Sequence, residues 1–313
     1  MQHINSDDAL YHSDIRNYLS LKKGNISSRP RRGLNVRPNG RSTDFIAPGF
    51  ATGCELACTY CYVARHRPLG NPLEQYTNLS DLWDVVSQHH SNLSPKIPNQ
   101  CDPKYWTYDI GESTDCLSPR NLESTNWYIS KFMETDAKPS FATKIAVPKG
   151  LNSIPNQGMA RIRISVAPQK IINILEPATS SLKSRLASIQ KLLDLGYEVH
   201  LNFSPITAYK GWVADYTELM HLINDTISDE AKQQLKCEVI FLTHSSALHN
   251  KHQGYFPEAE SMLWTPQWQE TKTTQRGDSS VVRYDKNVKP KLIEKFKELN
   301  ALFMPYCSVR YIF

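Results

Sequence analysis

Segments that favour strands alternate with segments that favour helices along most of this chain of 313 residues. Six short runs rich in apolar and β-branched residues are typical of strands, namely 44–49, 105–110, 140–147, 161–166, 197–204 and 237–243. Between them lie stretches typical of helices, some with apolar residues at three- and four-residue steps, namely 82–93, 121–134, 180–195 and 212–224. This order predicts a parallel sheet with right-handed crossovers, and an open partial (β/α)6 barrel fits it. In such barrels the chemistry sits at the C-terminal ends of the strands.

Three closely spaced cysteines follow the first predicted strand in a CxxxCxxC arrangement, namely Cys54, Cys58 and Cys61. Three thiolates suit a [4Fe-4S] cube, because one iron is left without a protein ligand and can bind a small molecule. A structural zinc ion needs four ligands, so this triad would have to recruit Cys101, Cys116 or His66. The aromatic residue between the second and third cysteines and the strand-to-helix context favour the cluster.

Composition allows a sizeable enzyme core, with 40% hydrophobic residues. The first eight residues lack the charged and apolar regions of a signal peptide, and no apolar stretch reaches membrane-spanning length. We therefore expect a soluble cytoplasmic protein with no membrane association. The four cysteines outside the triad are widely scattered, and in a reducing compartment they would remain thiols.

The net charge of +5 is mild, but one segment is strongly basic. Between positions 22 and 41 the chain has no acidic residue and seven basic ones, namely Lys22, Lys23, Arg29, Arg31, Arg32, Arg37 and Arg41. Its prolines and glycines oppose regular structure. Two interpretations stay open: a segment that lies along a phosphate backbone, or a solvated arm that wraps the domain.

The cysteine triad resembles that of the radical S-adenosylmethionine superfamily. There, three thiolates hold a [4Fe-4S] cluster whose fourth iron chelates the amino and carboxylate groups of S-adenosylmethionine, and one electron then yields a 5′-deoxyadenosyl radical. Tyr60 and Tyr62 flank the third cysteine, as two tyrosines do in the spore photoproduct lyase family. The resemblance implies that one or both relay a hydrogen atom towards the cofactor; alternatively, they shield the cluster from solvent.

Further matches to that family follow at the predicted strand ends. The stretch 111–115 is similar to the family's stretch ending in Ser-Asp, Lys144 to the lysine of its Thr-Lys, and Ser165 to a serine on its fourth strand. The resemblance implies that Lys144 contacts the carboxylate of S-adenosylmethionine, with Ser113 and Ser165 also around the cofactor.

Later segments match in the same order. The run 175–180 with Arg185 resembles the family's Glu-Pro-x-Thr-Ser…Arg signature, and the match runs from about residue 45 to the end of the chain. Locally the same run predicts a turn and a helix N-cap, with Thr179 or Ser180 as the cap.

Glu112 departs from the family pattern. In spore photoproduct lyase its position holds a cysteine that donates the final hydrogen atom to the repaired thymine radical, and a carboxylate has no weak bond to hydrogen. Gly111 and Glu112 instead resemble the Gly-Glu of many radical S-adenosylmethionine enzymes, where the glutamate or adjacent backbone meets the methionine ammonium. Cys116 is a substitute donor only if its loop turns it inward.

The resemblance implies a radical S-adenosylmethionine lyase-like enzyme that repairs a thymine photoproduct in DNA. Its candidates for hydrogen transfer are Tyr60, Tyr62 and Cys116. Two alternatives stay open. One is a radical S-adenosylmethionine enzyme acting on a peptide, a modified nucleoside or a small molecule; the other is a non-catalytic iron-sulfur or zinc protein that binds nucleic acid.

We expect three regions: a basic N-terminal arm at 1–43, a radical S-adenosylmethionine barrel at 44–245, and an α+β extension at 246–313 that closes the barrel. A photoproduct in duplex DNA would have to be flipped out to reach the barrel mouth. The arm could hold phosphates during that step, together with Arg276, Arg283 and Lys286. An electron donor such as flavodoxin or ferredoxin is the other expected partner.

Overall fold

The computed structural model describes residues 26–65, 73–273 and 280–313. Four residues named in the predictions above lie outside these ranges, namely Lys22, Lys23, His66 and Arg276.

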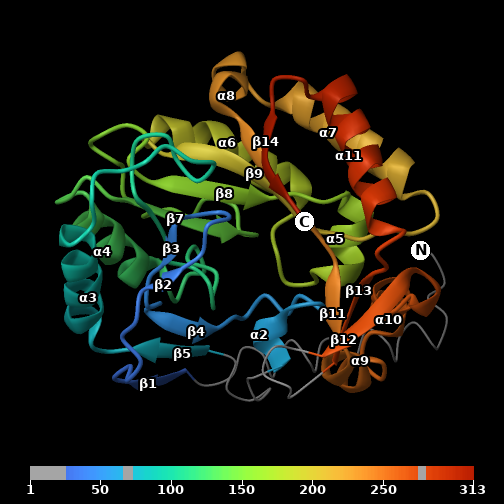
Figure 1. Cartoon of the computed structure of the whole chain (residues 1–313), viewed down its shortest axis with the longest axis horizontal. Helices are drawn as coiled ribbons and strands as arrows, with labels where there is room; N and C mark the ends of the chain where they lie inside the picture. Colours follow the sequence, from blue (N-terminus) through green and yellow to red (C-terminus); the bar gives the residue numbers. More distant parts are fainter. Residues whose placement is uncertain (1–25, 66–72, 274–279) are drawn as a thin grey trace, which may run out of the picture.

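An eight-stranded sheet forms the centre of the fold, in the order β14-β10-β9-β8-β7-β6-β3-β2. Its strands are β2 (Arg37–Pro38), β3 (Phe45–Ile46), β6 (Thr107–Asp109), β7 (Lys138–Thr143), β8 (Arg161–Ser165), β9 (Glu198–Ile206), β10 (Lys236–Phe241) and β14 (Ser308–Ile312). All neighbours pair in parallel except β2, which is antiparallel to β3. The six predicted strands are β3 and β6 to β10, and the sheet curls into an open half-barrel (Figure 1). The predicted α/β partial barrel is confirmed.

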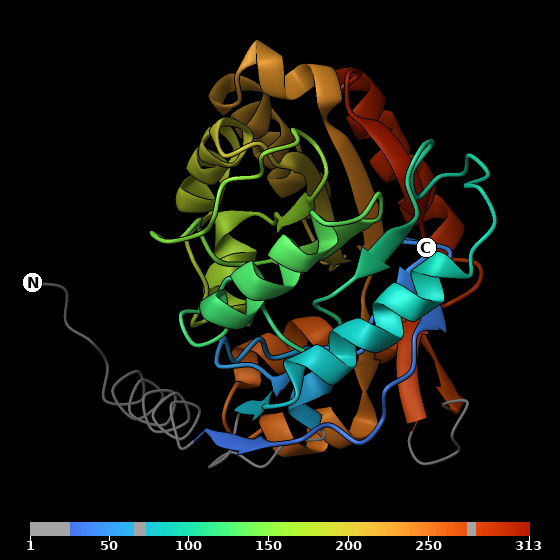
Figure 2. The same cartoon turned by 90° about the vertical axis from the view of Figure 1, so that its left-hand side faces the viewer.

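Helices cover the outside of this curved sheet (Figures 1 and 2). The four predicted helices are α3 (Leu79–Ser91), α4 (Leu122–Phe132), α6 (Leu182–Asp194) and α7 (Trp212–Thr226). Between β8 and β10 two further short helices were not predicted, α5 (Gln169–Leu175) and α8 (Asp229–Gln234). In α6 the apolar residues spaced three and four apart are buried, among them Leu182, Leu186 and Ile189. The helical period therefore decides which face packs on the sheet.

The predicted N-cap of α6 was wrong by one or two residues. Ser181 is the N-cap, and its side chain accepts a hydrogen bond from the amide of Ser184 at 3.3 Å. Ser180 Oγ accepts from the amide of Ala146 at 2.9 Å, because the residue lies beside the loop after β7. Thr179 instead donates its hydroxyl proton to a backbone carbonyl three residues earlier.

Apolar and charged side chains alternate along β8, so its two faces have different surroundings. Ile162 and Ile164 are fully buried in the hydrophobic core, whereas Arg161 and Arg163 form buried ion pairs with carboxylates of neighbouring elements. Ser165 follows the arginines in this alternation, at the C-terminal end of the strand. The polar side of the strand therefore leads to the end where function is expected.

The N-terminal segment lies against the barrel. Its strand β1 (Ser27–Arg29) pairs with β5 (Leu73–Tyr76), which also pairs with β4 (Ala51–Gly53), and this three-stranded sheet lies beside the cysteine loop. Arg29 forms an ion pair with Glu74 at 2.5 Å, and the Arg31 guanidinium donates to the carbonyls of Gly33 and Gly49. Several of the basic side chains are therefore already engaged within the protein.

The C-terminal residues build a second small sheet and then return to the barrel (Figure 1). The elements in order are β11 (Thr243–Ser245), α9 (Ser246–His252), α10 (Pro257–Leu263), η1 (Pro266–Trp268), β12 (Gln269–Thr273), β13 (Ser280–Tyr284) and α11 (Lys289–Phe303). Strand β13 lies between β11 and β12, and both pairings are antiparallel. After α11, β14 joins the main sheet beside β10. No helix among the described residues is long and apolar enough to cross a bilayer.

Candidate active site

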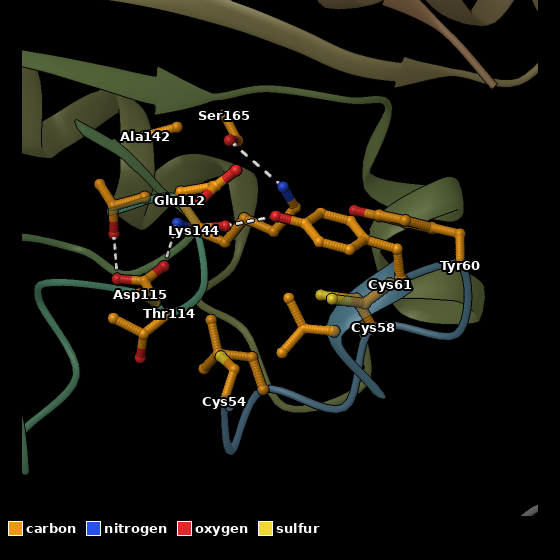
Figure 3. A pocket seen from close by; sticks show the side chains of 14 residues that line it. Cys54, Cys58, Tyr60, Cys61, Glu112, Thr114, Asp115, Ala142, Lys144 and Ser165 are labelled. Carbon is orange, nitrogen blue, oxygen red and sulfur yellow. Dashed lines mark hydrogen bonds between the residues drawn. The ribbon is translucent and has the colours of Figure 1, made fainter. Parts of the chain in front are cut away.

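A cavity opens at the C-terminal ends of β7 and β8, between these strands and the loop that carries the three cysteines (Figure 3). It contains about 530 Å³ of space not filled by protein atoms, part of which is open to solvent. Eight of the predicted site residues line it, namely Cys54, Cys58, Tyr60, Cys61, Tyr62, Glu112, Lys144 and Ser165. Tertiary folding therefore brings together side chains from four separate segments of the chain.

The cysteine loop connects β4 to the short helix α2 (Tyr62–Arg65). The amide of Cys61 donates to the carbonyl of Cys58 at 3.1 Å, so the loop turns back and presents these two thiols together. Ala57 just before them has φ +53°, a left-handed conformation that the tight loop imposes. The amide of Thr59 donates to the carbonyl of Leu175 at 2.9 Å, which ties the loop to the end of α5.

Burial makes two of these thiols unusually weak acids. Desolvation, together with the nearby Asp115 and Cys61, raises the pKa of Cys54 to about 12. Desolvation also raises the pKa of Cys58 well above its ordinary value, with Glu176 as a further cause. A thiol of such high pKa keeps its proton at neutral pH unless a metal ion replaces that proton. The three-thiol wall is chemically suited to a thiophilic metal cluster.

Lys144 lies across the cavity from the cysteines (Figure 3). Its Nζ is 3.3 Å from Ser165 Oγ and 3.4 Å from the carbonyl oxygen of Ser204. These long contacts with two neutral groups leave the ammonium able to bind an anion. The residue directly follows β7, and Ser165 ends β8, so the parallel register of the two strands brings them together.

Asp115 was not among the predicted site residues, although it belongs to the 111–115 stretch. Its carboxylate is buried and accepts hydrogen bonds from the Lys144 amide, the Thr143 hydroxyl and the Leu117 amide, at 2.8, 2.8 and 3.0 Å. Desolvation raises the pKa of Asp115, which these hydrogen bonds partly oppose. The side chain fixes the backbone of Lys144 relative to the loop after β6. The aspartate that ends the family's matching stretch, found here as Asp115, was the available signal.

Tyr60 lines the cavity, and its hydroxyl donates a hydrogen bond to the carboxylate of Glu176. Glu176 is buried and forms an ion pair with the guanidinium of Arg185 at 2.6 Å. The same guanidinium donates a hydrogen bond to the Ser165 carbonyl at 3.0 Å. Desolvation and the carboxylate raise the pKa of Tyr60 well above its ordinary value. Glu176 and Arg185 of the Glu-Pro-x-Thr-Ser…Arg run thus fix, by hydrogen bonds, the positions of Tyr60 and of the C-terminal end of β8.

Tyr62 and Arg37 both contact Glu112. The Tyr62 hydroxyl donates to the backbone carbonyl of Glu112, and Arg37 of β2 forms an ion pair with the Glu112 carboxylate. Arg37 is about half exposed. The Glu112 side chain therefore stands at the rim of the cavity between a cation from the N-terminal segment and the cysteine loop.

Two predicted residues do not line the cavity. Ser113 contributes its carbonyl oxygen, which accepts from the Gly53 amide at 2.9 Å. Cys116 is fully buried in the hydrophobic core. Its Sγ lies close to the backbone of Gly111, because a side-chain Cβ at position 111 would be only 3.0 Å from the sulfur. Cys101, considered above as a fourth zinc ligand, is also buried, and its Sγ donates to the carbonyl of Arg41. Neither Cys101 nor Cys116 joins the three-thiol wall.

An open α/β half-barrel with three thiols facing a lysine and a serine at its strand ends defines the class of radical S-adenosylmethionine proteins. A family model described as spore photoproduct lyase matches residues 7–313. The chain belongs to the spore photoproduct lyase family. Members of this family are radical S-adenosylmethionine enzymes with a [4Fe-4S] cluster, and they act in repair of DNA photoproducts.

Individual relatives agree with this assignment. The chain is 24% identical over 287 residues to spore photoproduct lyase of Clostridium acetobutylicum, covering 90% of this chain and 80% of that protein. It is also 24% identical over 283 residues to spore photoproduct lyase of a Geobacillus strain, with the same coverage. Among solved structures, a spore photoproduct lyase mutant with bound AdoMet and dinucleoside spore photoproduct superposes with a TM-score of 0.83 at 22% identity, over 95% of this chain and 84% of that one.

Proposed function

We propose that this chain holds a [4Fe-4S] cluster on Cys54, Cys58 and Cys61, binds S-adenosylmethionine beside Lys144, and acts on a photoproduct in DNA. The observation that carries the proposal is the cavity itself, in which three thiols and the ammonium of Lys144 line one space. When bound, the two cofactors supply a 5′-deoxyadenosyl radical that can abstract a hydrogen atom from the substrate.

Lys144 is proposed to bind the carboxylate of S-adenosylmethionine. Among the described residues its ammonium donates to two neutral oxygen atoms, at 3.3 and 3.4 Å, so a carboxylate would form a stronger, charge-assisted hydrogen bond. Ser165 is proposed to contact the same ligand through Oγ, which already lies on the cavity wall. Ser113 is proposed to act through the backbone of its loop.

Glu112 is proposed to meet the ammonium of S-adenosylmethionine. Glu112 lines the cavity, and its carboxylate already forms an ion pair with Arg37. The carboxylate has further lone pairs, so it can also accept a charge-assisted hydrogen bond from the ligand ammonium. In this role Glu112 is a binding residue. The cysteine that donates hydrogen at this position in spore photoproduct lyase is then absent from this chain.

Tyr62 is the proposed hydrogen donor in place of that cysteine. Its hydroxyl donates to the backbone carbonyl of Glu112, so its O–H bond lies next to the residue that replaces the family's cysteine. Tyr60 is proposed to assist from the same loop, although its proton is held by Glu176. Cys116 is the weaker candidate, because its thiol would have to leave the core to reach the cavity.

The partners follow from the same proposal. The proposed substrate is DNA that contains the photoproduct, and exposed basic residues of the 26–43 segment are proposed to contact its phosphates. A flavodoxin or ferredoxin is proposed to supply the electron, in the cytoplasm.

The test is an anaerobic assay of the reconstituted protein for 5′-deoxyadenosine, with irradiated DNA, with unirradiated DNA and without DNA. We expect irradiated DNA to stimulate 5′-deoxyadenosine formation and to lose its photoproduct. Stimulation by neither DNA, with cofactor cleavage intact, would assign the chain to a different substrate, such as a peptide, a modified nucleoside or a small molecule. The replacement of the family's donor cysteine by Glu112 is the observation that favours this second candidate.

A further inference from the structure

A second group of metal-ligating side chains lies outside the cavity, in the C-terminal small sheet and its helices. His244 of β11, His249 of α9 and Glu260 of α10 direct their ligand atoms at one point, all within 4.8 Å of one another. His244 Nε2 lies 3.0 Å and His249 Nδ1 2.6 Å from the same oxygen, Glu260 Oε2. Three elements that are separate in the sequence thus converge on a single carboxylate.

The charge and burial of this group call for a cation. Glu260 and His244 are 4% and 1% exposed, and the ion pairs of Glu260 within the described chain are with histidines alone. Glu260 Oε1 is buried without a hydrogen-bond partner among the described residues. A buried carboxylate is costly unless it is paired with positive charge and its lone pairs are satisfied.

We propose that His244, His249 and Glu260 bind one divalent transition-metal ion, with zinc as the commonest ion for such ligands. Two imidazole nitrogens and a carboxylate are typical zinc ligands at about 2.0–2.2 Å, which places ligand atoms about 3.3 Å apart in a tetrahedral site. The observed nitrogen–oxygen separations of 3.0 and 2.6 Å are shorter than this by about 0.3 and 0.7 Å, so the side chains would move apart by less than 1 Å to admit the ion. A carboxylate that binds through both oxygens also gives Oε1 a partner.

One side of the proposed site is more open to solvent than the others. His249 is the most accessible of the three ligands, with its side chain 20% exposed, and its ring stacks on Trp264 with centroids 4.3 Å apart. Solvent can therefore reach the ion past His249, while the indole fixes the plane of the ring.

Such an ion would stabilise the elements that contact the cysteine loop. His252, on the same helix as His249, donates from Nδ1 to the carbonyl of Thr59 at 2.9 Å, and Thr59 lies between Cys58 and Tyr60. Helix α9 also packs against α2, which follows the third cysteine. By joining β11, α9 and α10, the ion would stiffen the base on which the loop rests. This role goes beyond the proposed radical chemistry and does not depend on it.

The experiment uses zinc alone and the full chain in which Cys54, Cys58 and Cys61 are all replaced by alanine, so that no thiol of the triad competes. We expect about one zinc ion per chain by equilibrium dialysis and elemental analysis. Adding Glu260→Gln or His249→Ala should weaken zinc binding by more than the about 10- to 100-fold that loss of an outer contact costs. The matched control is His90→Ala, which removes another histidine–carboxylate pair, between His90 and Asp136, and should leave zinc binding unchanged.

Two further measurements keep the proposal falsifiable if a variant folds poorly. Zinc should raise the Tm of the parent chain and of His90→Ala, but not that of His249→Ala, because only a ligand bound to the folded state stabilises it. Cobalt(II) in the same chain should give visible ligand-field bands without the strong near-ultraviolet bands of thiolate ligation. Absence of bound zinc, or zinc binding that is unchanged in both His249→Ala and Glu260→Gln, would overturn the proposal.

Discussion

The hydroxyl of Tyr60 donates a hydrogen bond to the carboxylate of Glu176, a residue 116 positions further along the chain. Glu176 is held in turn by the guanidinium of Arg185, at 2.6 Å. This relationship joins the cysteine loop to the turn between α5 and α6, so that the loop position depends on a buried ion pair. It also engages the proton of the tyrosine that precedes Cys61.

Tyr60→Phe should destabilise the fold, because it leaves a buried carboxylate oxygen without its donor. We expect a loss of about 1–3 kcal/mol in the free energy of unfolding, measured by urea denaturation. Tyr209→Phe is the matched control, since Tyr209 donates to the Asp215 carboxylate away from the cavity. Both variants should lose stability, but only Tyr60→Phe should also lower 5′-deoxyadenosine formation. Equal activity in the two variants would contradict a role for Tyr60 at the cavity.

Cys58→Ala should abolish the iron-sulfur chromophore. The parent protein, purified without oxygen, should contain about four irons and four sulfides per chain. Cys307→Ala removes a buried thiol far along the chain, next to β14, and should keep the full iron content. Iron and sulfide analysis with the visible spectrum decides the matter. Stoichiometric zinc in the parent, with no cluster after reconstitution, would contradict the cluster assignment.

Lys144→Ala should weaken binding of S-adenosylmethionine by roughly 1.5–3 kcal/mol, the typical contribution of a hydrogen bond to a charged group. Isothermal calorimetry on the reconstituted protein measures this difference. Lys149→Ala is the control, because Lys149 is exposed and does not line the cavity. If Lys144→Ala and Glu112→Ala both bind as tightly as the parent, the cofactor lies elsewhere.

Stability should fall in mild acid because of His200, a fully buried side chain of β9 with Nε2 2.7 Å from Glu198. Burial lowers the pKa of His200 from 6.5 to about 4, and the nearby Arg161 adds to this effect. Between these two values the unfolded chain binds a proton that the folded chain does not. The free energy of unfolding should therefore decrease by roughly 3 kcal/mol as the pH falls from about 6.5 to about 4.

His200→Gln should flatten this part of the pH profile, measured by urea denaturation at several pH values. The exposed His221 provides the comparison, and His221→Gln should keep the slope of the parent. A parent profile that is flat over this interval would show that His200 is protonated in the folded state.

Arg32→Ala should weaken DNA binding and reduce its salt dependence. Arg32 is exposed in the N-terminal segment, whereas Arg29, Arg31 and Arg37 already contact groups of the protein. Loss of one phosphate contact lowers the slope of log K against log salt by about 0.9 on duplex DNA. Fluorescence anisotropy over a salt series measures the slope, with Lys295→Ala on α11 as the control. An unchanged slope would place the phosphate contacts elsewhere.

The boundaries 1–43, 44–245 and 246–313 remain predictions. Within them, the engaged side chains of Arg29, Arg31 and Arg37 favour the interpretation of the basic segment as an arm on the domain surface. Of the C-terminal basic residues, Arg283 pairs with Glu270 at 2.7 Å, and Lys286 is exposed. The exposed residues Arg32 and Lys286 are therefore the better candidates for phosphate contacts.

Local signals in the sequence were sufficient for the barrel and for its cysteine loop. The six strands were recognisable because each is a short run rich in apolar and β-branched residues, and the long helices because one face carries the apolar residues. The spacing of Cys54, Cys58 and Cys61 specified a three-thiol site without any knowledge of the fold. These features depend on residues that are close together in the chain.

Only the tertiary structure decided which distant groups meet. Glu112 and Arg37, Asp115 and the Lys144 backbone, and Glu176 and Tyr60 come from separate segments, and their contacts depend on strand register and on how loops close over the strand ends. The burial of Cys116 likewise depends on the close approach of Gly111 to the core. The sequence by itself determined the chemistry available at the barrel mouth, whereas packing determined which side chains reach the cavity, because direction and burial are properties of the folded chain.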